Sequence, residues 1–155
     1  MTTKKKTAGR YALPESPDGV RPVHMVVPVD DIVFNDYNPR APIDGEYLDE
    51  LAASIRAHGL LQPLVVRPVS DEPGYATHFE LVAGECRLRA CKLLNMLEVE
   101  VMVHPLLKGE AVVFCVVENM QRRNLTPLQE ARGLGRVMEE TGCHQKDLCG
   151  MLGVS

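Results

Sequence analysis

The pattern of apolar and polar positions changes near residue 25. Residues 1–24 mix a lysine run with proline, glycine, serine and threonine and have no apolar period. Such a segment buries too little apolar surface to offset the entropy of ordering it, so we expect a flexible N-terminal tail. From Met25 onward, short β-branched runs alternate with segments of helical period, an order typical of βαβ-type units.

Two sequence patterns predict the strands and helices that follow residue 25. Short β-branched runs predict strands at 25–27, 31–34, 64–67, 78–83 and 98–103, and in the last of these Val99, Val101 and Val103 alternate with polar or larger residues, as in a half-buried strand. Apolar residues spaced three and four apart predict helices at 46–58, about 85–95, about 108–121 and about 127–140. Gly59 supplies a left-handed stop for the first helix, and Thr126-Pro127 is a typical start for the last.

The last residues have the spacing of a helix-turn-helix. Leu148, the small Cys149, Leu152 and a turn at Gly153 fit its first helix and turn. We expect the sequence to stop before the recognition helix.

Composition narrows the class of protein. The chain has 155 residues, 45% of them hydrophobic, which is enough for one sizeable core. A net charge of −4 excludes an overall basic field, so any DNA contact must be local. The five cysteines form no C-x-x-C pair and no signal peptide precedes them, which predicts a reduced, cytosolic protein. No apolar run approaches the roughly 18 residues of a membrane span.

A phosphate site is predicted where the strand 78–83 ends. Gly84, Glu85, Cys86 and Arg87 follow this strand directly and open a helix. The arrangement gathers free backbone N–H groups, the positive end of a helix dipole and a guanidinium around one point. Arg87 can present a bidentate fork to phosphate oxygens. The alternative is a solvent-exposed arginine pair behind a tight turn.

A second polar cluster ends the third predicted helix. Glu118 and Arg122 stand four residues apart, and Asn119 shares their edge. Alone, this group is most often a helix-surface ion pair. Beside a phosphate site, the carboxylate and the amide oxygen suit Mg²⁺, which normally arrives with substrate phosphates, and Arg122 would neutralise a further phosphate.

Two other groups have alternative explanations. Gln62 stands at a helix-to-strand corner, where its amide contacts a base edge or a phosphate, or bridges the turn. Cys143, His144 and Cys149 match no standard zinc spacing, so we interpret these cysteines as core residues.

Four motifs in this order resemble the ParB family and its plasmid and nucleoid-occlusion relatives. They are Asn38-Pro39-Arg40, the segment from Ser54 to Arg67, Gly84-Glu85-x-Arg87-x-Arg89-Ala90, and Glu118-Asn119-x-Gln121-Arg122-x-x-Leu125-Thr126-Pro127. The resemblance covers about residues 25–155. Each motif alone is a weak signal, whereas four in order are a strong one.

The resemblance implies an α+β protein. A ParB/sulfiredoxin-like domain, a small mixed sheet with helices, would span 25–121, and the start of an all-α helix-turn-helix domain would span 122–155. Such a domain binds CTP with Mg²⁺, hydrolyses CTP slowly and closes as a clamp on DNA. By the family's motifs, the nucleotide would be held by Gln62, Gly84, Glu85, Cys86, Arg87 and Arg122, with Glu118 and Asn119 at the metal and Glu85 the candidate for hydrolysis.

The resemblance also implies partners. These are a palindromic partition-type DNA site, a second copy of the full-length protein, and a partition ATPase contacted through the N-terminal tail. The location would be the cytoplasm, on nucleoid or plasmid. Within this chain the candidate DNA-binding residues are Gln145, Lys146 and Ser155.

One departure from the family pattern leaves two alternatives open. The usual G-E-R-R is Gly84-Glu85-Cys86-Arg87 here, so a thiol replaces a guanidinium that would meet phosphate. Losing a charged hydrogen bond of roughly 1.5–3 kcal/mol weakens binding about tenfold or more. The chain is then a ParB-fold regulator without nucleotide control. Cys86 also matches the catalytic position of sulfiredoxins, which predicts an ATP-dependent redox enzyme as the second alternative.

Overall fold

The structure is a computed structural model that describes residues 11–13, 21–36, 42–70, 75–120 and 127–142. The chain forms two compact units. The first consists of residues 1–34 and 43–105, and the second of residues 35–42 and 106–155. No helix within the described ranges is long and apolar enough to cross a membrane.

The first unit is built on a mixed five-stranded sheet. Its strands are β2 (Val23–Pro28), β3 (Ile32–Val33), β4 (Leu64–Val69), β6 (His78–Ala83) and β7 (Glu98–Val103), in the order β2-β7-β4-β6-β3. β4 is parallel to β7 and antiparallel to β6, and β3 is parallel to β6. Strands joined by a helix are therefore antiparallel and not adjacent, so the predicted alternation does not produce parallel βαβ units.

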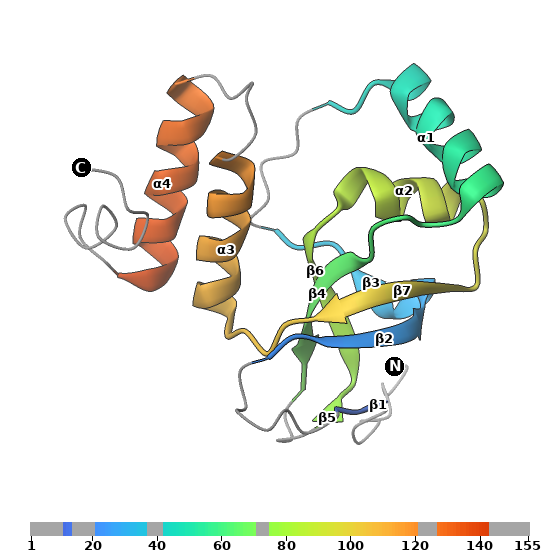
Figure 1. Cartoon of the computed structure of the whole chain (residues 1–155). Helices are drawn as coiled ribbons and strands as arrows, with labels where there is room; N and C mark the ends of the chain where they lie inside the picture. Colours follow the sequence, from blue (N-terminus) through green and yellow to red (C-terminus); the bar gives the residue numbers. More distant parts are fainter. Residues whose placement is uncertain (1–10, 14–20, 37–41, 71–74, 121–126, 143–155) are drawn as a thin grey trace, which may run out of the picture. The chain divides into compact units, whose positions relative to one another are not determined.

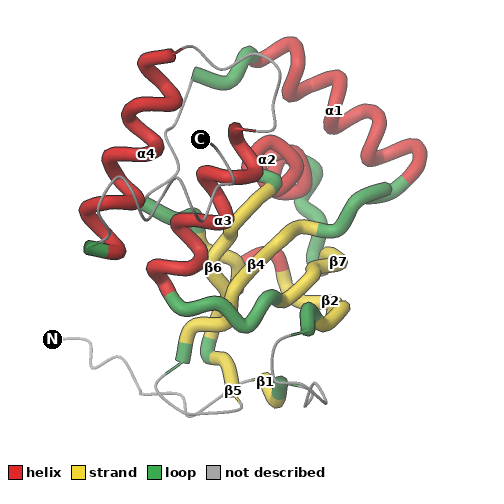
Figure 2. Tube along the Cα trace, turned by 60° about the vertical axis from the view of Figure 1, so that its left-hand side comes forward, coloured by secondary structure: helices red, strands yellow, loops and turns green. Residues whose placement is uncertain are grey.

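The strand predictions are confirmed with small shifts. β6 and β7 have the predicted bounds, and β2 and β4 each run longer than predicted. The segment predicted as a strand at 31–34 contains only β3, because Val29–Asp31 forms a turn of 3₁₀ helix just before it. The central strands β4 and β6 lie side by side, and α2 begins where β6 ends (Figure 2).

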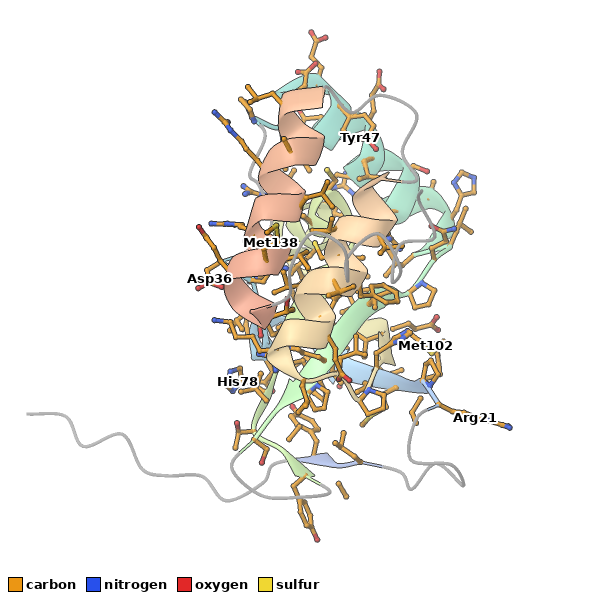
Figure 3. All side chains as sticks on the ribbon, turned by 90° about the vertical axis from the view of Figure 1, so that its left-hand side faces the viewer. Arg21, Asp36, Tyr47, His78, Met102 and Met138 are labelled. Atoms are coloured by element: carbon orange, nitrogen blue, oxygen red, sulfur yellow. The ribbon has the colours of Figure 1, made fainter. Side chains whose placement is uncertain are left out.

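Helices α1 (Gly45–His58) and α2 (Glu85–Leu93) cover one face of this sheet (Figure 1). Asp44 caps α1, since its carboxylate accepts from the Glu46 N–H at 3.1 Å. Gly59, at φ +75°, ends α1 as predicted by donating its N–H to Ile55. The exposed ring of Tyr47 marks the first turn of α1 (Figure 3). The core between the helices and the sheet contains Val27, Ala52, Ile55, Leu64, Val66, Phe79, Leu81, Leu88, Cys91 and Val101.

Part of the predicted N-terminal tail belongs to the fold. Tyr11–Ala12 forms β1, which pairs antiparallel with β5 (Tyr75–Ala76). The Tyr11 ring packs against Phe79, with 5.2 Å between ring centroids, and its hydroxyl donates to the Asp31 carboxylate. The predicted flexible tail is therefore wrong for these residues, and for those at the start of β2. Their order comes from pairing with residues far along the chain, which a local apolar period does not reveal.

Removing the Tyr11 hydroxyl tests this attachment. Tyr11→Phe should lower the free energy of unfolding by about 1.5–3 kcal/mol, because a hydrogen bond to a charged carboxylate is lost while the ring stays. Urea denaturation measures the change. Tyr75→Phe, which removes the hydroxyl of an exposed tyrosine on the partner strand, is the matched control and should have no effect. Equal stabilities of Tyr11→Phe and the natural chain would contradict the attachment.

The second unit contains α3 (Lys108–Met120) and α4 (Pro127–Thr141), which pack against each other. Gly133 lies at this contact, where a Cβ would be 3.5 Å from Val116 Cγ1, an ordinary van der Waals distance. The two helices confirm the predicted ranges. The division into compact units falls at residue 105 and places α3 with α4, while the predicted domain boundary near residue 121 stays a prediction. An unbroken apolar run from Ala111 to Val117 allows either assignment from sequence alone.

A buried ion pair joins the two central strands. Arg67 on β4 lies opposite Glu80 on β6, and the two side chains form a salt bridge. They are only 14% and 10% exposed. The Arg67 Nε is also buried and has no hydrogen-bond partner among the described residues. Glu80 therefore compensates a cation that is largely shielded from water.

Candidate functional site

The candidate site begins at Gly84, the residue between β6 and α2. Gly84 has φ +106° and ψ +34° and is the N-cap of α2, where no side chain caps the helix. Its carbonyl accepts from the Leu88 N–H at 2.9 Å, which starts the helix. This φ value is one that side-chain-bearing residues rarely adopt. The first turn of α2 therefore presents backbone N–H groups at the positive end of the helix dipole, as an anion site requires.

Arg87 closes over this glycine. A Cβ on Gly84 would lie 3.1 Å from Arg87 Nη2 and 3.2 Å from its Cζ, so the absence of a side chain makes room for the guanidinium. Arg87 Nη1 donates to the carbonyls of Gln62 and Pro63, both at 2.9 Å. Arg87 thus ties the loop after α1 to the start of α2, in addition to bringing its charge to the predicted phosphate site.

The other predicted nucleotide residues of this unit lie around Arg87. Gln62 is exposed, and its own carbonyl accepts from Arg87. Cys86 is a free, half-buried thiol in the first turn of α2. Cys91, one turn further on, is fully buried. Burial raises the pKa of the Cys91 thiol, while the Arg87 charge acts in the opposite direction. Cys91 is therefore a core residue, and Cys86 is the thiol that lies at the site.

Glu85 is held by an arginine that the sequence analysis did not assign. Arg89 Nη2 and Nε both donate to Glu85 Oε1, at 2.7 Å and 3.1 Å. The guanidinium in turn lies over the Phe34 ring, with 5.3 Å from its Cζ to the ring centroid. Lys92 Nζ lies 5.1 Å from the same centroid. The i, i+4 spacing of Glu85 and Arg89 is the sequence signal that predicts this pair.

The predicted metal ligands belong to the second unit. Glu118 is half-buried near the end of α3, and Asn119 follows it on the same helix, although the Asn119 side chain lies outside what the structure describes. Arg122 also lies outside the described residues, so the predicted Glu118–Arg122 edge stays a prediction. The structure thus brings together Gln62, Gly84, Glu85, Cys86 and Arg87, and carries Glu118 on a separate unit.

The predicted DNA-binding residues Gln145, Lys146 and Ser155 lie outside the described residues, as do Cys143, His144 and Cys149. Within the described ranges, no group of three or more histidine, cysteine, aspartate or glutamate side chains could hold a metal ion. The described part of the chain thus has, at the start of α2, the groups that an anion site requires, and no metal cage of its own. A divalent cation that comes with a phosphate ligand fits such a site better than a resident ion.

The fold and the site define a class of protein. It is an α+β unit with a candidate anion site where a strand ends and a helix begins. Comparison with family models assigns this class more closely, because residues 17–120 match the ParB N-terminal domain. The chain belongs to this family. The predicted resemblance and the predicted α+β fold are thereby confirmed.

Sequence relatives agree with this assignment. The chain is 38% identical over 119 residues to a probable chromosome-partitioning protein ParB of Coxiella burnetii, covering 77% of this chain and 39% of that protein. It is 37% identical over 127 residues to a nucleoid occlusion protein of Geobacillus kaustophilus, covering 82% and 43%. The chain thus spans about two fifths of the length of the curated relatives it matches.

Two solved structures of Caulobacter crescentus ParB, both C-terminally truncated, share the fold. One is complexed with CTP-gamma-S and is 32% identical to this chain, with a TM-score of 0.57; the match covers 86% of this chain and 72% of that one. The other is complexed to the centromeric parS site and is 30% identical, with a TM-score of 0.59; the match covers 84% and 65%.

Proposed function

We propose that this chain binds CTP together with Mg²⁺ at the start of α2. The observation that carries the proposal is the cradle formed by Gly84 and Arg87. A glycine in the left-handed region opens the helix, the guanidinium lies against it, and the backbone N–H groups of the first turn face the same point. A similar protein of known structure holds a CTP analogue, which supports CTP as the ligand.

The proposed nucleotide residues are Gln62, Gly84, Cys86 and Arg87, with Glu85 as the group that acts in slow hydrolysis. By the family's motifs, Glu118 and Asn119 would act through Mg²⁺ and Arg122 through phosphate. A carboxylate and an amide oxygen are hard ligands that suit Mg²⁺.

Equilibrium dialysis against the four nucleoside triphosphates tests the proposal. With Mg²⁺ in excess, the chain should retain CTP and show at least about tenfold weaker binding of ATP, GTP and UTP, a difference of about 1.4 kcal/mol. Retention of CTP should fall when Mg²⁺ is chelated. Equal retention of all four nucleotides, or of none, would contradict the proposed function.

A second candidate function follows from Cys86. This thiol stands in the first turn of α2, where the family pattern has an arginine, so the cradle has one cation fewer. A ParB-fold regulator without nucleotide control is the function that this loss favours.

Cys86→Arg separates the two candidates. If the natural chain binds CTP, the substitution should strengthen binding by about tenfold, the worth of one added charged hydrogen bond. Isothermal titration with CTP and Mg²⁺ measures the change, and Cys91→Ala, which alters a fully buried core thiol of the same helix, is the control. CTP binding that exists only in Cys86→Arg would favour the regulator instead.

The proposed role in the whole protein is partition or a related form of gene control on DNA. In the full-length protein, CTP would close a homodimer into a clamp after a palindromic site is recognised through the helix-turn-helix. A partition ATPase would contact the N-terminal tail, and the protein would lie on nucleoid or plasmid in the cytoplasm. A Caulobacter ParB complexed to parS and relatives named for chromosome partition and nucleoid occlusion support this role.

A further inference from the structure

Two cations of α2 lie over one aromatic ring. The Arg89 guanidinium carbon is 5.3 Å from the centroid of the Phe34 ring, and Lys92 Nζ is 5.1 Å from the same centroid. Because both lie this close to one point, the two positive charges are neighbours. Each contact has the distance of a cation–π interaction, so the ring helps to hold both side chains in place. Phe34, Arg89 and Lys92 are called the Phe34 cluster below.

Lys92 gives the Phe34 cluster its uncompensated charge. Its side chain is exposed, and it forms no ion pair with any residue that the structure describes. Arg89 differs, because it is 39% exposed and donates to Glu85 Oε1 at 2.7 Å. Like charges repel, so a second cation beside Arg89 is tolerated best where an anion can approach from solvent. The cluster therefore fits an anionic partner, with Lys92 as the main contact.

The helix α2 concentrates cations in a chain that is acidic as a whole. With a net charge of −4, only a local basic surface can contact a polyanion. The short α2 carries Arg87, Arg89 and Lys92 against a single acid, Glu85. The longer α1 has the opposite balance, with three acids and one arginine. Within the first unit, the local basic surface therefore lies on α2.

We propose that the Phe34 cluster is a contact site for the sugar-phosphate backbone of duplex DNA. Duplex DNA carries one charge per roughly 1.7 Å of its axis, so two neighbouring cations face several phosphates at once. An acidic protein surface presents fewer and less regular charges. The ring also lowers the freedom that Lys92 loses on binding. A backbone contact positions a protein on DNA without reading its sequence. The site is separate from the proposed nucleotide site and from the proposed helix-turn-helix.

Fluorescence anisotropy with two labelled duplexes of unrelated sequence tests the inference on the whole 155-residue chain, without nucleotide. Lys92→Met should weaken binding by about fivefold at low salt, and equally for both duplexes. The slope of log K against log salt concentration should fall by about 0.9, the share of one phosphate contact. Lys92→Arg, which keeps the charge, should stay within about twofold of the natural chain.

Two further variants separate the site from general charge. Arg21→Met removes an exposed cation that lies before β2, outside the cluster (Figure 3), and should change the affinity by less than about twofold. Phe34→Leu keeps both charges but removes the ring, and it should weaken DNA binding about twofold because the cations are held less well. Thermal unfolding confirms that each variant is folded, and the exposed Lys92 is the position least coupled to folding.

Three results would overturn the inference. They are equal losses in Lys92→Met and Arg21→Met, an unchanged salt slope in Lys92→Met, and no DNA binding by the natural chain at low salt. Sedimentation tests the other class of partner. Self-association at low salt that Lys92→Met abolishes, with DNA binding unchanged, would assign the cluster to an acidic protein surface instead. Failure of the chain to bind CTP would refute the proposed function and leave this inference standing.

Discussion

Replacing Glu80 by glutamine is expected to lower the free energy of unfolding by about 3–5 kcal/mol, because it leaves the buried Arg67 cation without its counter-charge. The shape of the side chain hardly changes, so the effect reports charge rather than packing. The Arg67 Nε is buried and already lacks a hydrogen-bond partner among the described residues, so the guanidinium has few ways to compensate for the loss of Glu80. Urea denaturation measures the loss, which is a large share of a typical domain stability of about 5–15 kcal/mol.

An exposed pair in the same sheet is the control for this prediction. Glu100 Oε2 on β7 lies 3.5 Å from His24 Nε2 on β2, and the two side chains are 56% and 50% exposed. Glu100→Gln should change the stability by no more than about 0.5 kcal/mol, because water screens such a pair. Replacing both Glu80 and Arg67 by apolar residues, as Glu80→Leu with Arg67→Met, should recover most of the stability. Similar losses in Glu80→Gln and Glu100→Gln would show that burial of the first pair has no energetic consequence.

Replacing Gly84 by alanine is expected to weaken CTP binding by more than about tenfold. The new Cβ would lie 3.0 Å from Leu64 Cδ2 and 3.1 Å from Arg87 Nη2, so the guanidinium must shift. The backbone φ of +106° adds a conformational cost of about 1–3 kcal/mol. Isothermal titration for affinity and urea denaturation for stability measure the two effects separately.

A substitution at Gly142 distinguishes the effect of the displaced Arg87 side chain from the effect of backbone strain. Gly142, which ends α4, has φ +67° and no atom within 4 Å of where a Cβ would stand. Gly142→Ala therefore carries strain without a displaced side chain, and it should lower stability while CTP affinity stays unchanged. CTP binding that survives Gly84→Ala would mean that Arg87 need not lie against a glycine, and the cradle would not be the nucleotide site.

Elements with a local signal could be predicted from the sequence, and those that depend on distant pairing could not. The junction of β6, Gly84 and α2 was predicted at the right residues because the strand period stops at a glycine and a helical period follows. β1 was missed because Tyr11–Ala12 is too short to show a period and its partner strand β5 lies far along the chain.

The candidate site shows the same division. The types of residue in the first turn of α2 follow from the sequence, since a glycine and an arginine at a helix start favour an anion. The bonds from Arg87 to the carbonyls of Gln62 and Pro63 could not be predicted, because they require the loop after α1 to fold beside α2. The Glu85–Arg89 pair was predictable from its spacing, whereas the Phe34 ring beneath Arg89 depends on where β3 ends.

Amide hydrogen exchange with and without CTP and Mg²⁺ tests the central claim most directly, because it locates the bound nucleotide along the chain. We expect slower exchange of the backbone N–H groups of residues 85–87 when CTP is present, and no such change with GTP. These groups open α2 and are the donors that would hold the phosphates. Exchange at residues 85–87 that CTP leaves unchanged, or that GTP slows equally, would contradict the assignment of a CTP site to this helix.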